Sequence, residues 1–224
     1  MTKVYLAIDQ GTTSSRAILF DQNGNSLFTA QKEFRQIFPH PGWVEHDPEE
    51  IWQSVLDVCH QVVAQADKDG LKIAGTGITN QRETTLVWDR TAGQPVYNAI
   101  VWQDRRTADI CAGLTAKGAA AEIEQCTGLV IDPYFSASKI AWILDNVEGA
   151  RQRAESGELV FGTVETFLIW RLTEGRTHIS DATNAARTSL LNISSGDWDE
   201  GMCALFNVPM QMLPDVVDLS LIHI

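Results

Sequence analysis

With 224 residues, the chain is long enough for one large domain or two small ones, and it can bury a sizeable core. Hydrophobic residues make up 44% of it and charged residues 21%, which is typical of an ordinary soluble globular protein. The formal net charge of −12 argues against a nucleic-acid-binding surface, which would show clustered lysine and arginine. It is compatible with a nucleotide ligand, because magnesium and one or two local cations suffice for a triphosphate.

The chain carries no pattern that would send it into or across a membrane. Its N-terminus lacks the charged-then-apolar pattern of a signal peptide, and no apolar run approaches membrane-spanning length. The four cysteines are widely spaced and include no C-x-x-C pair, as expected of reduced thiols. We therefore expect a cytoplasmic protein with no nucleic-acid or membrane partner.

The first elements are three strand-like runs joined by two short turns. Residues 4–8 and 17–20 are almost continuously apolar, as in buried strands. A tight turn at 23–25 leads into a third run at 26–34. Between the first two runs, residues 9–16 supply a carboxylate, a glycine, four hydroxyls and a guanidinium. This pattern predicts an antiparallel strand meander whose first turn is strongly polar.

That first turn contains the groups that bind phosphate. Backbone N–H and hydroxyl groups can surround an anion, Arg16 can add a fixed charge, and Asp9 can hold the magnesium that accompanies phosphates. The same residues also suit a plain polar hairpin with solvated hydroxyls, because short glycine motifs produce many false positives. Both interpretations are open on this stretch alone.

Helices and strands alternate along the rest of the chain. Asp47 and Pro48 are typical of a helix N-cap and first turn, and Ser136 is expected to cap a later helix. The pattern predicts strands at residues 72–79, 84–88, 99–102 and 159–161, and helices at 48–69, 104–124 (interrupted near Gly118), from 136 onward and at 165–172. This succession indicates an α/β layered domain.

Three further places carry residues that suit a polyol ligand. Arg82 and Glu83 lie in a polar break between two strands, where they offer both donors and an acceptor, as hydroxyl groups require. Trp102 ends a strand and Tyr134 lies in a rigid loop, and an aromatic face suits the C–H side of a polyol. Each also has a structural interpretation: a solvated ion pair, a core tryptophan, a loop tyrosine. The polar run at 180–189 is either a plain loop or a buried hydrogen-bonded turn that supports the site.

Together and in order, these runs resemble the glycerol kinases of the FGGY carbohydrate kinase family. The resemblance rests on Asp-Gln-Gly-Thr-Thr-Ser-Ser-Arg at 9–16, Asn-Gln-Arg-Glu-Thr-Thr at 80–85, Val-Trp-Gln-Asp-Arg-Arg at 101–106 and Asp-Pro-Tyr-Phe at 132–135. Residues 134–146 also resemble the first signature of the wider family, and similarity runs from about Val4 to about Val216.

The resemblance implies a fold, a reaction and a set of site residues. The fold would be an actin-like, ribonuclease H-like ATPase domain, with a mixed sheet that begins as an antiparallel meander and is flanked by helices. By position, ATP would contact Thr12, Thr13, Ser14 and Arg16, and Asp9 would hold Mg²⁺ through water. Glycerol would be bound by Arg82, Glu83, Trp102 and Tyr134. The implied reaction transfers the γ-phosphate to a terminal hydroxyl, giving glycerol 3-phosphate, while a carboxylate accepts the hydroxyl proton.

The chain departs from the family pattern toward its C-terminal end. The Gly-Asp-Gln run that carries the family's catalytic aspartate does not occur, so we expect the base to lie beyond Ile224 and the chain alone to be inactive. Neither Asp104 nor Asp181 is a substitute, since each belongs to a different motif. Residues 1–218 are interpreted as an incomplete N-terminal carbohydrate kinase domain, residues 219–224 as a tail unlike the family, and the second domain as absent.

Two other functions stay open. The parent protein can be a kinase for another polyol or a pentulose, or the chain can be a non-catalytic polyol-binding module. For the parent enzyme we expect a homo-oligomer, either a dimer or a tetramer.

Overall fold

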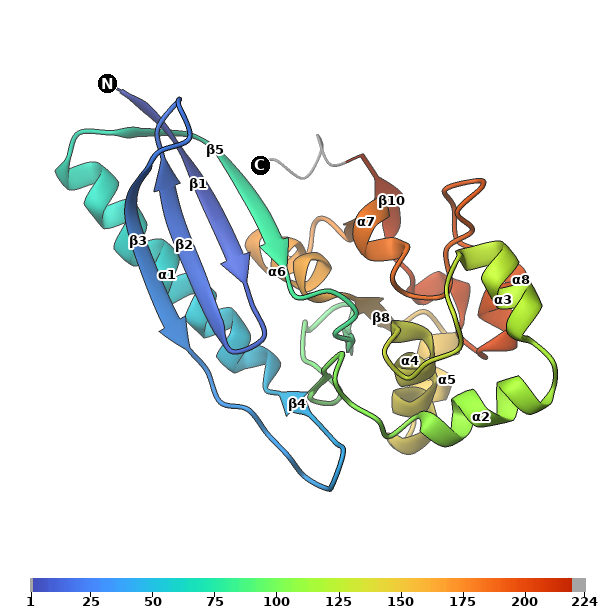
Figure 1. Cartoon of the computed structure of the whole chain (residues 1–224). Coiled ribbons are helices and arrows are strands. Elements are labelled where there is room, and N and C mark those ends of the chain that lie inside the picture. Colours follow the sequence, from blue (N-terminus) through green and yellow to red (C-terminus); the bar gives the residue numbers. More distant parts are fainter. Residues whose placement is uncertain (1, 219–224) are drawn as a thin grey trace. The chain divides into compact units, whose positions relative to one another are not determined.

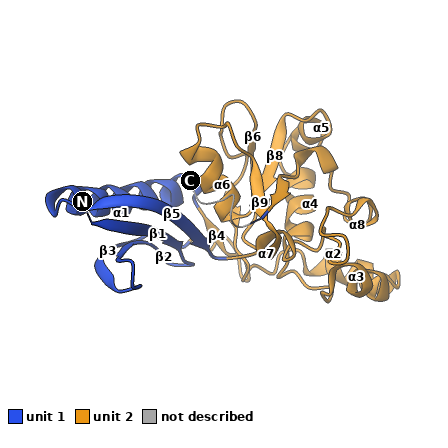
Figure 2. Ribbon diagram, turned by 90° about the horizontal axis from the view of Figure 1, so that it is seen from above, with its two compact units in different colours: residues 1–36, 47–81, 218–224 blue, residues 37–46, 82–217 orange. Residues whose placement is uncertain are grey.

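The chain divides into two units of different architecture, which are coloured separately in Figure 2. A computed structural model describes residues 2–218. Within that range, unit 1 comprises residues 2–36, 47–81 and 218, and unit 2 comprises residues 37–46 and 82–217. Each unit is described by itself.

Unit 1 is a four-stranded sheet with one long helix (Figure 1). The strands β1 (Lys3–Gln10), β2 (Ser14–Phe20), β3 (Ser26–Glu33) and β5 (Lys72–Asn80) are arranged in the order β3-β2-β1-β5. Strand β1 pairs antiparallel with β2 and parallel with β5, and β2 pairs antiparallel with β3. The predicted antiparallel meander and the mixed sheet are therefore confirmed.

Helix α1 (Pro48–Lys68) packs on this sheet because of its apolar stripe. As predicted, it begins at Pro48 after the N-cap Asp47, whose carboxylate accepts a 2.8 Å hydrogen bond from Glu49 N. Alternate strand residues point to the helix, since side chains on a strand alternate between its two faces. The buried residues of this layer are Val4, Leu6, Ile8, Ala17 and Leu19 on the strands and Ile51, Val55, Val58 and Val62 on the helix.

Unit 2 is built from short elements around a larger core. Its strands are β4 (Glu45–His46), β6 (Leu86–Asp89), β7 (Ala99–Ile100), β8 (Leu159–Gly162), β9 (Ile179–Asp181) and β10 (Asp215–Val217). Its helices are α2 (Ala108–Ala116), α3 (Ala120–Thr127), α4 (Ser136–Asn146), α5 (Ala150–Glu155), α6 (Val164–Leu172), α7 (Ala182–Ala185), α8 (Glu200–Leu205) and the 3-10 helix η1 (Met210–Met212). The strands pair two by two: β6 with β8 and β4 with β7 antiparallel, and β9 with β10 parallel.

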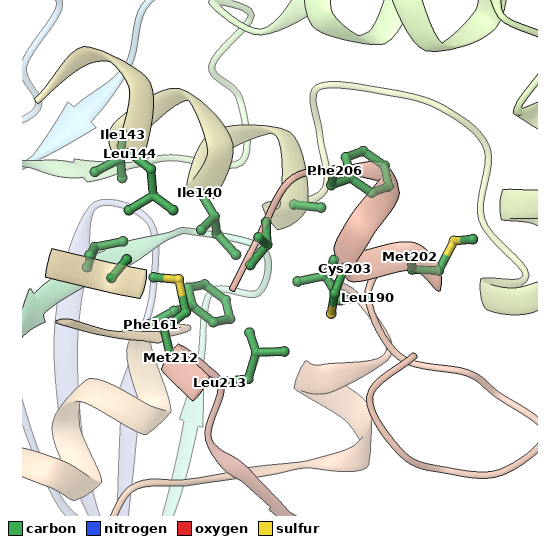
Figure 3. Packing of buried hydrophobic residues seen from close by; sticks show 14 of the residues in the cluster. Ile140, Ile143, Leu144, Phe161, Leu190, Met202, Cys203, Phe206, Met212 and Leu213 are labelled. Carbon is green, nitrogen blue, oxygen red and sulfur yellow. The ribbon is translucent and has the colours of Figure 1, made fainter. Parts of the chain in front are cut away.

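The core of unit 2 forms around one face of α4. Figure 3 shows Ile140, Ile143 and Leu144 from this helix packed in the cluster with Phe161 of β8. Leu190, Met202, Cys203, Phe206, Met212 and Leu213 extend the cluster from the last third of the described chain. Burying this apolar surface fixes the start of α4. The loop of Tyr134 leads into this point, and Ser136 there bonds to the loop of Glu83.

Most predicted elements of unit 2 are present. As expected, the helical region at 104–124 is interrupted at Gly118, which has the left-handed φ of 78° that favours glycine, and its first helix begins at Ala108. Ser136, however, is not the N-cap of α4: Phe135 occupies that position, and the Ser136 hydroxyl bonds elsewhere. The short elements α5, α7, α8, β9 and β10 carry too little periodicity to be predicted.

Two further expectations from the sequence concern the C-terminal tail and helices that could span a membrane. The tail expected at 219–224 lies outside the described residues. Within residues 2–218, the structure has no helix with the length and apolar character needed to cross a membrane.

Candidate functional site

The predicted phosphate turn is the β1–β2 hairpin of unit 1. It is tight, because Gly11 N donates a 2.9 Å hydrogen bond to Ser14 O across the turn. A Cβ atom at Gly11 would approach Ser14 O to 3.3 Å, a tight contact that needs a small shift of the turn. The turn is also held from outside, because Gln36 Nε2 donates to Thr12 O and Phe34 N donates to Thr13 O. Its shape is therefore fixed independently of any ligand.

The four hydroxyls of this turn do not all face the same way. Thr13 is exposed and Thr12 is half-buried. Ser14 is buried, and its Oγ accepts a 3.0 Å hydrogen bond from Gln31 Nε2, which leaves the serine its own proton to donate. Ser15 points to the helix side, where its Oγ lies 2.8 Å from Ser54 Oγ. Thr13 is therefore exposed at the turn and Ser14 keeps a proton to donate, whereas Ser15 bonds to helix α1.

Asp9, Arg16 and Gln31 form a row across three strands. The register pairs Asp9 with Arg16 and Arg16 with Gln31. Arg16 Nη1 lies 3.5 Å from Asp9 Oδ2, and Arg16 Nε donates to Gln31 Oε1 at 3.3 Å. Both charged side chains are more than a third exposed, so this ion pair contributes little to stability.

The side chains of Asp9 and Arg16 in this row suit the binding of a phosphate together with Mg²⁺. The Asp9 carboxylate accepts no hydrogen bond from the residues that the structure describes, so its oxygens are available to a hydrated cation. Magnesium is commonly bound through one or two carboxylates together with phosphate oxygens and several waters. Arg16 lies beside that carboxylate and has a charge that can bind phosphate.

In unit 2, the break after β5 holds Glu83 in an unusual conformation. Its φ of 63° is left-handed, which is strained for a residue with a side chain. Two hydroxyls stabilise it, because Thr85 Oγ1 and Ser136 Oγ each donate a 3.1 Å hydrogen bond to Glu83 O. The side chain is 4% exposed, and Arg187 Nε donates to its Oε1 at 2.6 Å.

Arg82, the neighbour of Glu83, is placed differently. It is exposed, and its side chain makes no hydrogen bond or ion pair with residues 2–218. Only its carbonyl oxygen is engaged, accepting a 2.8 Å hydrogen bond from Thr84 N. The structure therefore bonds Glu83 to Ser136 and Arg187 of unit 2, whereas the Arg82 guanidinium has no such partner among residues 2–218.

Trp102 and Tyr134 lie side by side. Their ring centroids are 5.5 Å apart with planes tilted by 60°, and both side chains are half-buried. The Tyr134 loop is held by its backbone: Tyr134 N donates to Asp132 Oδ1 at 2.8 Å, and Lys139 Nζ donates to Tyr134 O at 2.6 Å. Lys139 is fully buried, and this burial lowers its pKa to about 7.

The loop that carries Trp102 is held by a buried charged cluster. Arg106 Nη2 lies 2.7 Å from Glu45 Oε1 and 2.8 Å from Asp104 Oδ2, and all three side chains are at most 2% exposed. The Arg106 guanidinium carbon also lies 3.9 Å from the ring centroid of Trp43. Because a buried charge is costly unless it is paired, this cluster fixes the backbone around Trp102.

Almost the whole sequence matches one known protein family. A model described as the FGGY family of carbohydrate kinases, N-terminal domain, matches residues 4–223. The chain belongs to this FGGY family of carbohydrate kinases.

Known FGGY family members agree in sequence and in structure. Glycerol kinase 1 of Pseudomonas aeruginosa is 61% identical over 220 residues, which cover 98% of this chain and 44% of that protein. The crystal structure of Plasmodium falciparum glycerol kinase with ADP has a TM-score of 0.92 at 38% identity, covering 96% of this chain and 43% of that one. The gluconate kinase structure from Lactobacillus acidophilus, at 24% identity and a TM-score of 0.87 over 97% of this chain and 42% of that one, shows the fold alone.

These matches confirm the expected fold and show what share of its relatives' length the chain covers. It has the actin-like ATPase fold of the FGGY kinases, as predicted. It spans less than half the length of the relatives that it matches.

Two carboxylates of the FGGY motifs are fully engaged and cannot serve as a base without leaving their partners. Asp104 accepts hydrogen bonds from Val44 N at 2.6 Å and Arg106 N at 2.8 Å, besides its ion pair. Asp181 caps α7, accepting from Asn184 N and Asn184 Nδ2, each at 2.9 Å. These hydrogen bonds hold the backbone at Val44 and Arg106 and at the start of α7.

Arg187 is the site residue that sequence reasoning missed. It lies in the polar run 180–189, which is a buried hydrogen-bonded turn rather than a plain loop, with Ser180, Asp181, Asn184, Thr188 and Ser189 all at most 5% exposed. The signal was an arginine inside an otherwise uncharged stretch after Asp181. Nothing in the linear sequence connects it to Glu83, because the two are 104 positions apart.

Proposed function

We propose that this chain is the polyol-binding half of an ATP-dependent glycerol kinase, which forms glycerol 3-phosphate in the cytoplasm. The single observation that carries the proposal is that Arg187 links Glu83 to the paired rings of Trp102 and Tyr134: it donates to the Glu83 carboxylate and lies 5.7 Å from the Tyr134 ring centroid. Tyr134 packs on Trp102, and the residue that follows its loop, Ser136, bonds the Glu83 backbone. The buried carboxylate offers a hydrogen-bond acceptor for hydroxyls, and the two half-buried rings offer an aromatic surface for C–H groups.

The names of the relatives point to glycerol rather than a larger sugar. Glycerol kinase is the printed name of the relative at 61% identity and of the structure at 38% identity. The gluconate kinase at 24% identity supports the fold only, so it does not favour a sugar acid. Glycerol is thus the acceptor to test first.

In unit 1, the hairpin would take the phosphates of ATP. Thr12, Thr13 and Ser14 would offer hydroxyl and amide donors, Arg16 would neutralise phosphate charge, and Asp9 would hold Mg²⁺ through water. The nucleotide, once bound with its magnesium, supplies the γ-phosphoryl group that passes to a terminal hydroxyl of glycerol. The role of this chain is to bind and orient both partners.

The proton acceptor for that hydroxyl would lie in the part of the parent protein beyond Ile224. Losing a general base costs about 10²–10⁴ in rate. The chain alone should therefore bind glycerol but turn it over poorly, and the full-length parent should be active.

The experiment measures glycerol 3-phosphate formed from glycerol and Mg-ATP by the purified chain and by the full-length parent. We expect product only from the full-length protein, and none from its Asp9→Ala variant. Product from the chain alone that disappears on Asp9→Ala would mean that a base lies among its own carboxylates. A full-length protein that phosphorylates a pentulose but not glycerol would show that the proposed acceptor is wrong.

A further inference from the structure

The turn at residues 180–189 places one arginine against the predicted polyol residues. Asp181 begins the short helix α7, and Arg187 N then donates a 3.0 Å hydrogen bond to Asn184 O. The next residue, Thr188, accepts a 2.8 Å hydrogen bond from Ala137 N at the start of α4. The backbone on both sides of the arginine is therefore fixed to the core of unit 2.

Among residues 2–218, the Arg187 side chain makes one charged contact, to Glu83. Its Nε donates to Glu83 Oε1 at 2.6 Å, which is short for such a bond. The glutamate side chain is 4% exposed, so its charge needs a partner inside the protein. Its other oxygen, Oε2, accepts no hydrogen bond from residues 2–218. One carboxylate oxygen is thus held and the other is available.

Two aromatic rings lie close to the Arg187 guanidinium. The Arg187 Cζ atom lies 4.9 Å from the ring centroid of Phe135 and 5.7 Å from that of Tyr134. Arginine stacks on aromatic faces through its flat guanidinium group, which a lysine cannot reproduce. The side chain is 33% exposed, so it lies at the edge of the site rather than in the core.

We propose that Arg187 is a positioning residue of the polyol site, which holds Glu83 Oε1 so that Oε2 accepts a hydrogen bond from a substrate hydroxyl. This inference rests on the proposed function. It goes further, because it assigns the orientation of the acceptor to a residue more than a hundred positions away. A fixed acceptor selects a ligand that has a hydroxyl at that one position, so Arg187 affects which polyol binds.

The test is a titration of the chain with glycerol, for wild type and variants. Binding is monitored through the amide NMR signals of the protein. Arg187→Gln removes the charge and the Nε donor, and we expect it to weaken glycerol binding about tenfold or more, the effect of losing one charge-assisted hydrogen bond. Arg187→Lys keeps the charge but not the planar fork, so it should recover only part of the affinity. Propane-1,2-diol lacks one hydroxyl of glycerol. The ratio of the affinities of wild type and Arg187→Gln should therefore be smaller for propane-1,2-diol than for glycerol.

Arg153→Gln is the matched control. Arg153 is also paired with a carboxylate at 2.6 Å, Asp89 Oδ2, and its side chain is 38% exposed, but neither residue is among the predicted glycerol residues. Its removal should leave the affinity for glycerol within about twofold of wild type.

A double-mutant cycle separates positioning from a structural effect. If Arg187 acts through Glu83, Arg187→Gln should weaken binding strongly in the wild-type background and by less than about twofold in the Glu83→Gln background. An equal effect in both backgrounds would overturn the proposal. If Arg187→Gln does not fold, as judged by its amide spectrum, the same comparison is made with Arg187→Lys.

The outcomes distinguish this inference from the proposed function. Saturable glycerol binding by the wild type, unchanged in Arg187→Gln and Arg187→Lys, would overturn the positioning role and leave the proposed function intact. Absence of saturable glycerol binding by the wild-type chain would overturn both.

Discussion

Lys139 Nζ donates a 2.6 Å hydrogen bond to the carbonyl oxygen of Tyr134. It donates a second one, of 2.9 Å, to Phe135 O, so a single buried amine fixes two consecutive carbonyls before α4. A neutral amine still has two hydrogens, and both bonds therefore survive deprotonation. The backbone of the predicted glycerol tyrosine is thus held by this interior lysine together with Asp132.

Lys139 makes the stability of the chain depend on pH. Burial lowers its pKa to about 7, whereas the unfolded chain has a lysine pKa of about 10.4. Above pH 7 the unfolded state binds one more proton than the folded state, so the free energy of unfolding rises with pH. Relative to Lys139→Met, wild type should gain at most roughly 1.4 kcal/mol per pH unit between pH 7 and 9, measured by urea unfolding.

The control for this experiment is Lys117→Met, which removes an exposed lysine. A difference between wild type and Lys139→Met that stays constant from pH 7 to 9 would contradict the prediction, because it would mean that the buried amine does not change its protonation in that range.

Tyr134→Phe should weaken glycerol binding while the fold persists. The substitution removes the hydroxyl and keeps the ring, which packs on Trp102 and Phe135. Loss of one hydrogen bond to the ligand should lower the affinity about threefold to tenfold, measured by calorimetric or NMR titration. Tyr97→Phe is the control, because the Tyr97 hydroxyl donates to Glu45 inside the protein. Equal affinities for wild type and Tyr134→Phe would restrict Tyr134 to a packing role.

Asp104→Ala should destabilise unit 2 far more than loss of a surface ion pair does. Removing this carboxylate leaves the buried Arg106 with one fewer partner, which typically costs about 3–5 kcal/mol. Asp145→Ala, which removes an exposed partner of Arg151, should cost at most about 1 kcal/mol. Chemical denaturation of both variants checks the comparison, and similar losses in the two would mean that the Arg106 cluster is not a major source of stability.

Gly162→Ala should overpack the core of unit 2. A Cβ atom there would lie 2.7 Å from Trp88 and from Thr166, closer than carbon atoms approach. We expect a loss of about 1–3 kcal/mol in the free energy of unfolding. Gly113→Ala in α2 is the matched control, because nothing lies within 4 Å of its Cβ and alanine favours a helix by up to about 1 kcal/mol. Tolerance of Gly162→Ala would contradict the tight packing at β8.

Arg16→Ala in the full-length parent should lower turnover at saturating glycerol. If Arg16 neutralises phosphate charge, its loss should reduce kcat about tenfold to a hundredfold, measured by glycerol 3-phosphate formation. Arg35→Ala is the matched control, since this exposed arginine pairs with Glu50 at 3.4 Å, much as Arg16 pairs with Asp9 at 3.5 Å. Unchanged turnover in Arg16→Ala would make Arg16 a structural residue of the hairpin.

The sequence predicted unit 1 better than unit 2. The meander and α1 follow from local patterns, because apolar runs, a short polar turn and an Asp-Pro helix start act within a few residues. Unit 2 consists of short strands and helices whose stability comes from the shared core around Ile140 and Phe161. Periodicity is weak in such elements, so α5, α7 and α8 were not predicted.

The candidate site divides in the same way. Linear motifs were enough to name Glu83, Trp102 and Tyr134 and to predict the family, because each motif is continuous in the chain. They did not separate Arg82, which is exposed, from Glu83, which is buried beside it. That difference accompanies the left-handed backbone at Glu83, which is held by a local hydrogen bond from Thr85 and a long-range one from Ser136.

The sequence by itself therefore determined the family, the strand meander with its polar turn, and the residue types offered to phosphate and polyol. Only the tertiary structure decided that Ser136 bonds the Glu83 backbone and that Arg187 holds the Glu83 carboxylate. The physical reason is that burying a charge requires a partner, and the partner that folding supplies can come from any part of the chain.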